Sequence, residues 1–443
     1  MKINKLLTLT VLALGFSGGV FAQEKIWTLQ ECVDYALENN ITVQKGANTL
    51  LINDEDITAA KGSFLPSLSA SARQGLSLGN QELFPGQFVD RTANSTNMGI
   101  NVNQTIFNGF RNTNLHKQAQ LTLDRNQLEL NRIKDDISLN VVNAYLNILF
   151  NKENLETAQA QIAFSTKQLN QVKALVDAGV QPQANVYDAE ATVSSDEQTL
   201  TVAENNYNLA ILTLSQLLQL PYNGFQVEII EVDSPSAALM YNDIQPILDY
   251  AYENRYEIKV AEKNIEGAEL NTELSKSGYL PNVSFGYGFG SNVFYTNLQD
   301  DEPSFGNQIN DNKAHSFSLN IGIPIFSQFQ NKTAVAKAKI QKENSELDLQ
   351  QAKLNLESNI QRAFTDAQAA LKAYEASKKS VAAQTLSFEN AQERYTLGSM
   401  NTFDLEQSRI QLINAQSRLI NAKYDFVFKT KVLDFYLGKP ITQ

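Results

Sequence analysis

The sequence predicts a mainly α-helical protein with a membrane β-barrel portion, formed by two copies of one structural unit. Three observations lead to this fold class. Short runs of sequence return at a nearly constant spacing, each copy holds a long stretch without glycine or proline, and each copy holds two segments in which apolar and polar residues alternate. Together they predict one β-hairpin and one very long helix in each copy.

The duplication is visible in short runs of the first half that return in the second half. Runs near the start of each half return 215 positions later, and those farther along return 219 positions later. A loop of the second copy is therefore four residues longer. This divides the chain into a first repeat at 23–221, a segment between the repeats at 222–243, and a second repeat at 244–443. The matching pairs are residues 35–40 with 250–255, 64–66 with 279–281, Gly179 with Gly398, and Leu218 with Leu437.

Residues 1–22 have the order of a secretory signal peptide. Lys2 and Lys5 precede an apolar run, and small residues follow it up to Ala22. The apolar run is shorter than the ~20 residues that a membrane-spanning helix needs, so export is favoured over a single-pass anchor. The only cysteine, Cys32, does not stand at the predicted cleavage site, and we expect it in the core of a helix bundle.

Two stretches without glycine or proline predict the long helices, at residues 111–178 and 332–397. Each could extend on the order of 100 Å at 1.5 Å per residue, so it needs helical neighbours along its length. Residues spaced three and four apart predict the seam of that contact. In the first copy the seam is Leu130, Ile133, Ile137, Val141, Ala144, Ile148, Asn151 and Leu155, and in the second it is Leu349, Ala352, Leu356, Ile360, Ala363, Ala367, Ala370 and Tyr374.

Four segments alternate with a period of two and predict strands, at about 67–79, 96–107, 282–296 and 315–326. Apolar and aromatic side chains occupy one face, and serine, asparagine and glycine occupy the other, as in a membrane barrel. Four strands cannot close a barrel, and open edges are not tolerated in lipid, so such a barrel needs more than one chain. The polar connections at 80–95 and 297–314 are expected to be exposed loops.

No motif of catalysis or cofactor binding is found. The sequence has no phosphate-binding loop, zinc-protease motif or nucleophile elbow, and His116 and His315 are far apart in the chain. The glycines at 286, 288 and 290 lie within a strand pattern and are interpreted as small residues facing a lumen. Lysine plus arginine number 36 and aspartate plus glutamate 48, which argues against a nucleic-acid partner. We therefore expect no enzyme, cofactor or metal site.

The order of these features resembles the TolC family of outer-membrane efflux proteins over residues 27–440. The specific pieces are Thr28-Leu29, Cys32 and Tyr35-Ala36-Leu37, the Leu-Pro before each hairpin, Phe107-Asn108-Gly109-Phe110, and Arg394-Tyr395 with Gly398 and Asp404-Leu405. The resemblance implies a homotrimer with a twelve-stranded barrel in the outer membrane and a barrel of helices in the periplasm. It also places segment 222–243 in a belt around the helices.

The resemblance also implies a gate at the periplasmic tip. Tyr395 and Asp404 stand where the family places a gating tyrosine and an aspartate of the constriction. Met400, Gln407 and Asn185 replace the arginine and two further aspartates, so we expect a gate of Tyr395, Asp404 and Asn185 with one acidic ring. A second, compatible interpretation is that Asp404 caps a helix. The predicted contacts with the adaptor are in two exposed turns, at Gly179 and Val180 and at Gly398, Ser399 and Met400.

The function expected from these features is a passive exit duct in the outer membrane. An inner-membrane pump and a periplasmic adaptor would engage it, and the pump would supply the energy because this chain has no nucleotide site. The competing hypothesis is a membrane-anchored coiled-coil scaffold that transports nothing. The polar faces of all four predicted strands favour a wet lumen, and thus the duct.

Overall fold

The computed structural model describes residues 25–230 and 243–441. The predicted signal peptide and residues 231–242 of the predicted belt segment lie outside the described residues. The chain forms two compact units. Unit 1 comprises Met1–Gln44, Ile133–Ala251 and Leu356–Gln443, and unit 2 comprises Lys45–Arg132 and Tyr252–Asn355. Each repeat therefore contributes to both units.

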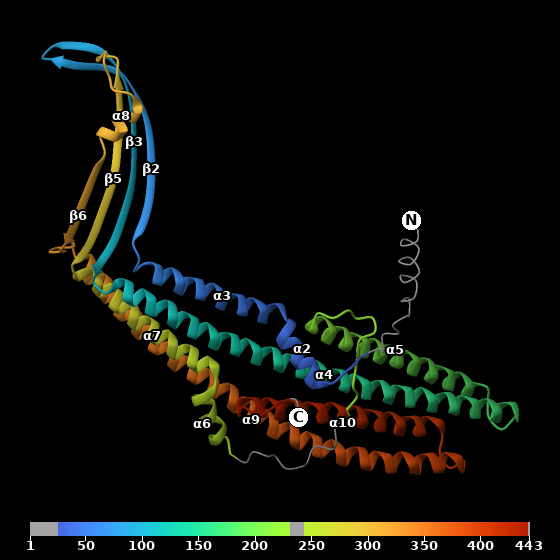
Figure 1. Cartoon of the computed structure of the whole chain (residues 1–443). Coiled ribbons are helices and arrows are strands. Elements are labelled where there is room, and N and C mark those ends of the chain that lie inside the picture. Colours follow the sequence, from blue (N-terminus) through green and yellow to red (C-terminus); the bar gives the residue numbers. More distant parts are fainter. Residues whose placement is uncertain (1–24, 231–242, 442–443) are drawn as a thin grey trace, which may run out of the picture. The chain divides into compact units, whose positions relative to one another are not determined.

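Unit 2 contains a four-stranded antiparallel sheet in the order β2-β3-β5-β6 (Figure 1). Each repeat supplies one hairpin, and the central pair β3 and β5 joins the two hairpins over a long register from Ala93 with Thr296 to Asn108 with Asn282. The outer strands β2 and β6 each have one edge without a strand neighbour among the described residues. The strands are β2 (Ser67–Phe84), β3 (Gln87–Asn108), β5 (Asn282–Thr296) and β6 (Ala314–Gly322).

The connection predicted as a loop at 80–95 is instead the distal part of the β2-β3 hairpin. The two strands pair up to the turn at Gly86, which has φ of +83°. The alternation of apolar and polar residues is weak in this part of the hairpin. The strands still form there because their pairing depends on backbone hydrogen bonds, which polar side chains do not prevent. Strand β6 ends at Gly322, earlier than predicted, and Pro324 follows without an N–H to continue the ladder.

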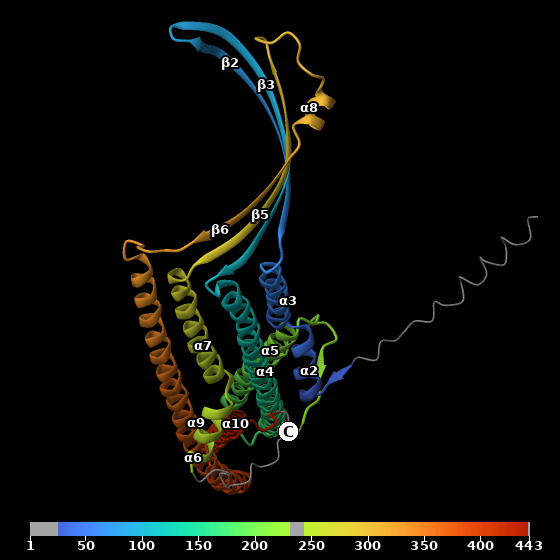
Figure 2. The same cartoon turned by 60° about the vertical axis from the view of Figure 1, so that its left-hand side comes forward.

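The second connection, also expected to be a loop, holds the short helix α8 (Phe305–Asp311). The Ser304 hydroxyl accepts a hydrogen bond from the backbone N–H of Asn307 at 3.5 Å, which caps the helix at its N-terminus. Figure 2 shows α8 beside the sheet, level with the distal part of β5.

Four helices form a row in unit 2, in the order α3, α4, α7 and α9. Asn126 on α4 donates to Asn53 on α3 at 2.7 Å, and Gln118 on α4 donates to Asn271 on α7 at 2.8 Å. Lys342 on α9 pairs with Glu269 on α7 at 2.7 Å. The row follows the strand order, with α3 and α9 at its edges. The elements are α3 (Ile41–Gly62), α4 (Arg111–Asp177), α7 (Tyr256–Lys276), the 3₁₀ turn η1 (Ser277–Tyr279) and α9 (Gln330–Thr396).

Unit 1 is built around the remaining parts of α4 and α9. The short strands β1 (Ile26–Trp27) and β4 (Gln226–Val227) pair in parallel beside α2 (Leu29–Asn39), which begins with a capping box of Thr28 and Glu31. Cys32 is fully buried in the main core, as predicted. The other helices of unit 1 are α5 (Ala184–Leu218), α6 (Gln245–Asn254) and α10 (Thr402–Tyr436).

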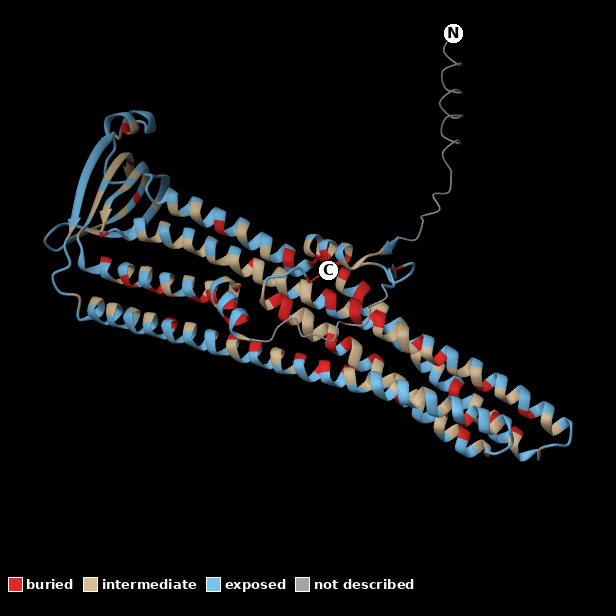
Figure 3. Ribbon diagram, turned by 90° about the horizontal axis from the view of Figure 1, so that it is seen from below, coloured by how far each residue is buried: buried red, intermediate tan, exposed pale blue. Residues whose placement is uncertain are grey.

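Helices α4 and α9 have 67 residues each and lie close to their predicted bounds. None of the sixteen predicted seam residues is exposed, and Val141, Ile148, Ile360 and Ala367 are fully buried. Figure 3 shows buried residues separated by exposed ones along both helices, as expected for long helices that contact neighbours on narrow stripes. Within the described residues, no helix combines the length and apolar character needed to cross a membrane.

Candidate functional site

The sheet of unit 2 has one apolar face and one face of small polar residues. The pairing register puts the alternating apolar side chains of all four strands on the same side. Leu68 and Phe317 are 73% and 72% exposed in the single chain. A soluble protein rarely exposes so large an apolar surface. The apolar face contains Leu68, Ala70, Ala72, Met98, Ile100, Val102, Phe285, Tyr287, Phe289, Phe317, Leu319 and Ile321.

The opposite face explains the glycine run of β5. A Cβ added at Gly286 would lie 2.6 Å from the Ser318 hydroxyl, and one at Gly288 would lie 2.7 Å from the Ser316 hydroxyl. Both glycines therefore make room for serines of the neighbouring strand and do not belong to a dinucleotide loop. The result is a continuous small, polar face, suited to contact with water.

The two helix turns of unit 1 have the same backbone geometry. Gly179 and Gly398 have φ of +72° and +70° and no atom within 4 Å of an added Cβ. In the first turn the N–H of Val180 donates to Leu175, and in the second the N–H of Ser399 donates to Arg394, both at 2.9 Å. This is the Schellman ending of a helix, in which glycine is needed for its backbone conformation and not for space. Both predicted adaptor turns are thus similarly built, and their residues are exposed except for Met400, which is half-buried.

The predicted gate residues lie around these turns and form no hydrogen bond or ion pair with one another among the described residues. Tyr395 is half-buried, and its buried hydroxyl has no hydrogen-bond partner among the described residues. Asn185 donates to Gln181 of its own turn at 3.2 Å. Asp404 is exposed in the first turn of α10. The structure of one chain therefore brings the three residues to the same end of unit 1 but does not join them.

The cap of α10 is Asn401 and not Asp404, which corrects the second interpretation of Asp404. The Asn401 side chain accepts the backbone N–H of Asp404 at 2.8 Å. Asp404 is thus the third residue of the helix. Its carboxylate stays in solvent and interacts favourably with the positive N-terminal end of the helix dipole.

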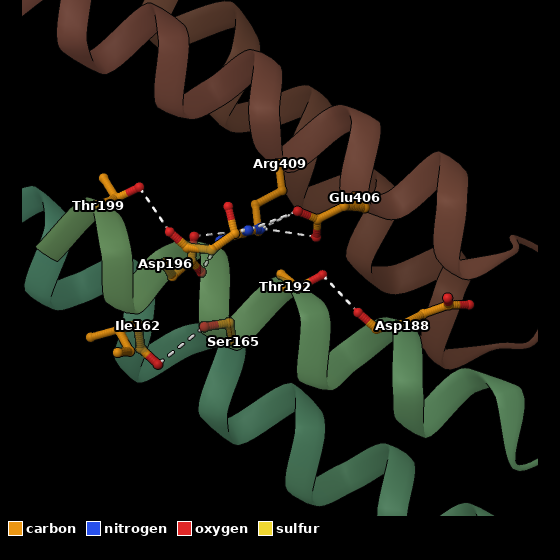
Figure 4. Close-up of polar contacts among 9 residues, drawn as sticks. Ile162, Ser165, Asp188, Thr192, Asp196, Thr199, Glu406 and Arg409 are labelled. Atoms are coloured by element: carbon orange, nitrogen blue, oxygen red, sulfur yellow. Dashed lines mark hydrogen bonds and ion pairs between the residues drawn. The ribbon is translucent and has the colours of Figure 1, made fainter.

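A group of three charges, of which Arg409 and Asp196 are buried, joins α5 and α10 and was missed from the sequence (Figure 4). The guanidinium of Arg409 lies 3.0 Å from Asp196 Oδ2 and 2.7 Å from Glu406 Oε1. The side chains of Arg409 and Asp196 are only 7% and 9% exposed. Burial by itself would lower the pKa of Arg409, but hydrogen bonds to Glu406 and Asp196 outweigh it and raise the pKa above its ordinary value.

A sequence signal for this group did exist. Asp196 continues the buried spacing of Val186 and Ala189 on α5, and Arg409 lies one turn after buried Leu405 on α10. A charged residue on a helix seam requires a partner of opposite charge. The two are 213 positions apart, so the spacing alone did not pair them.

The described residues contain no cluster of three or more histidine, cysteine, aspartate or glutamate side chains that could hold a metal ion. His315 makes a 2.9 Å hydrogen bond with Tyr287, and His116 is on α4.

Comparison with known proteins identifies the family of this chain. The model of a family described as outer membrane efflux protein matches residues 32–219 and 247–439. The chain belongs to this family. The two matched ranges fall within the two repeats expected from the sequence. The resemblance to the TolC family is confirmed.

Curated relatives match this outer membrane efflux protein over most of their length. Outer membrane protein TolC of Vibrio cholerae serotype O1 is 21% identical, covering 98% of this chain and 96% of the relative. Outer membrane efflux protein BepC of Brucella suis is also 21% identical, covering 92% of this chain and 84% of the relative. One relative is thus named as an outer membrane protein and the other as an outer membrane efflux protein.

Solved structures share the fold. The CusC structure superposes with a TM-score of 0.78 at 17% identity, covering 93% of this chain and 92% of that one. The outer membrane protein VceC of Vibrio cholerae superposes with a TM-score of 0.74, also at 17% identity, covering 93% and 96%. The mainly helical fold with a strand portion is therefore that of outer membrane channel proteins.

Proposed function

We propose that this protein is an exit duct of the cell outer membrane that serves efflux or secretion. The observation that carries the proposal is the two-faced sheet, with an apolar face suited to lipid and a small, polar face suited to a water-filled lumen. The relatives named as efflux and export proteins of the outer membrane support the same function and location.

The functional unit in this proposal is a homotrimer with twelve strands. The open edges of β2 and β6 support it, because unpaired backbone groups are not tolerated in lipid. On the edge helix α9, Ile340, Leu347 and Leu354 repeat every seven residues and are 58%, 54% and 60% exposed. Such a stripe fits against a helix of a neighbouring copy, so both the strands and the helices would continue from chain to chain.

The energy for transport would come from a partner. The chain has no nucleotide motif, so we assign no catalysis to it and expect an inner-membrane pump to drive the cargo. A periplasmic adaptor would contact the turns at Gly179 and Val180 and at Gly398, Ser399 and Met400. Their exposure and common Schellman geometry support that role, because a fixed turn presents the same backbone surface in both repeats.

The gate would be formed by Tyr395, Asp404 and Asn185 where three copies meet. In a trimer, three exposed Asp404 carboxylates near one axis would attract cations and repel anions. The buried hydroxyl of Tyr395 has no hydrogen-bond partner within the described part of the chain, which supports a hydrogen bond to another copy or to water.

The test is single-channel conductance of purified trimer in a planar bilayer under a salt gradient. We expect discrete, cation-selective steps, and weaker selectivity for Asp404→Ala. The control is Asp348→Ala, which removes an exposed acid of α9 outside the turn and should keep the selectivity. Selectivity that is the same in Asp404→Ala and wild type would remove the acidic gate but leave the duct.

The competing function is a membrane-anchored coiled-coil scaffold. It needs no lumen and predicts no conductance steps from folded, inserted trimer. The continuous small, polar face of the sheet favours the duct, because an anchor has no need for a water-facing surface.

A further inference from the structure

A groove of about 620 Å³ separates α8 from the apolar face of the sheet. This volume lies within the range of small-ligand sites. Most of the sheet side chains in the groove belong to the apolar face, and α8 supplies the other wall. The lining includes Ala70, Ala72, Met98, Ile100 and Phe289 of the sheet and Ile309 and Lys313 at α8.

The groove is preformed, because α8 is fixed to the free edge of β5 by three hydrogen bonds. Ser291 donates to the carbonyl of Ile309 at 2.7 Å, and Asn312 donates to that of Asn292 at 2.7 Å. The backbone N–H of Phe294 donates to Gln308 at 2.8 Å. Beyond the end of β6 these bonds replace a strand neighbour. They hold α8 at a fixed distance from the sheet.

The width of the groove follows from small side chains. Ala70 and Ala72 stand on the same face as Leu68, which is 73% exposed and does not line the groove. Two alanines in place of large residues leave a channel between Met98 and Ile309 that nothing in the described chain fills. Its largely apolar walls suit a linear hydrocarbon chain.

The groove lies beside a polar interruption of the apolar face. On one side, Gln74 is hydrogen-bonded to Asn94 and Thr96 and separates the groove from Leu76 and Leu78, which continue the apolar face toward the hairpin turn. On the other side, Tyr287 and His315 are hydrogen-bonded at 2.9 Å among aromatic rings. Aromatic residues with a polar group concentrate at the level of lipid headgroups in membrane barrels.

We propose that this groove binds one acyl chain of an anionic lipid, whose negatively charged headgroup lies beside Lys313. The inference rests on the proposed placement of the sheet in the outer membrane. Lys313 is the charged residue of the groove. It is exposed at the rim and forms no ion pair with the described residues. A zwitterionic headgroup would gain less from this lysine than an anionic one.

The test is native mass spectrometry of the full-length trimer in detergent, with phosphatidylglycerol or phosphatidylcholine of identical acyl chains as the probe. We expect wild type to retain phosphatidylglycerol preferentially. Ala72→Phe fills the groove and should lower retention about tenfold or more, and Ala70→Phe serves as an independent second variant. Leu68→Phe, on the same strand and face, is the matched control and should retain the lipid.

The charge is tested with Lys313→Gln, for which the preference for phosphatidylglycerol should disappear, and Lys332→Gln is the control at another exposed lysine. Full retention in both groove-filling variants would overturn the site. Equal retention of the two lipids by wild type would overturn the headgroup contact. Conductance recorded on the same preparations reports on the duct separately, so loss of the groove is distinguishable from loss of the proposed function.

Discussion

Replacing Arg409 should loosen the packing of α5 against α10. Arg409→Met leaves Asp196, which is 9% exposed, as a buried carboxylate without its cation. Removing one partner of a buried pair costs about 3–5 kcal/mol. Glu406 is 23% exposed and can return to water, so most of the cost falls on Asp196.

The measurement is hydrogen–deuterium exchange of the native trimer, read on peptides covering residues 190–200 and 405–412. If these amides exchange through local separation of the two helices, the loss of 3–5 kcal/mol speeds exchange by roughly two to three and a half orders of magnitude. Peptides from the sheet of unit 2 should not change. Arg418→Met is the matched control, because Arg418 is an exposed residue of the same helix.

The double variant Asp196→Leu with Arg409→Met separates a missing charge partner from a missing side chain. Replacing both members of a buried pair by apolar residues of similar size is often neutral or stabilising. We therefore expect the double variant to exchange more slowly than Arg409→Met alone. Unchanged exchange in the single variant, or no recovery in the double variant, would refute the assignment of the cost to a buried unpaired carboxylate.

Two further predictions concern the turn of α9 and the core of unit 1. Gly398→Leu should impair pump-dependent efflux of a dye with the trimer intact, because a backbone φ of +70° costs a residue with a side chain about 1–2 kcal/mol. The control Gly62→Leu changes a glycine at an open site without positive φ and should leave efflux unchanged. Efflux at the wild-type rate in Gly398→Leu would contradict the adaptor contact. Burial, with a smaller contribution from Glu31, raises the pKa of the Cys32 thiol to about 12, so the reactive thiolate stays scarce until the pH approaches that value. Native protein at pH 8 should therefore resist a thiol reagent that labels the unfolded chain rapidly, and rapid native labelling would show that Cys32 is not buried.

Much of the secondary structure could be predicted because its causes are local. A period of two identifies strands, and the absence of glycine and proline over long stretches identifies α4 and α9. The seam residues could also be named, since a spacing of three and four places them on one side of a helix. The predicted loops failed for the opposite reason. Polar residues at 80–95 and 305–311 carry no periodic signal, so whether they form a strand, a helix or a loop depends on their partners.

The sequence by itself determined the duplication, the amphipathic strands, the buried cysteine and the turn glycines, because each depends on residues close together in the chain or on repeated spacing. Only the tertiary structure decided that β3 pairs with β5, that α8 covers the edge of β5, and that Arg409 meets Asp196. The physical reason is distance along the chain. Charge and shape complementarity depend on two surfaces together, and the local pattern of one sequence does not identify which two surfaces come into contact.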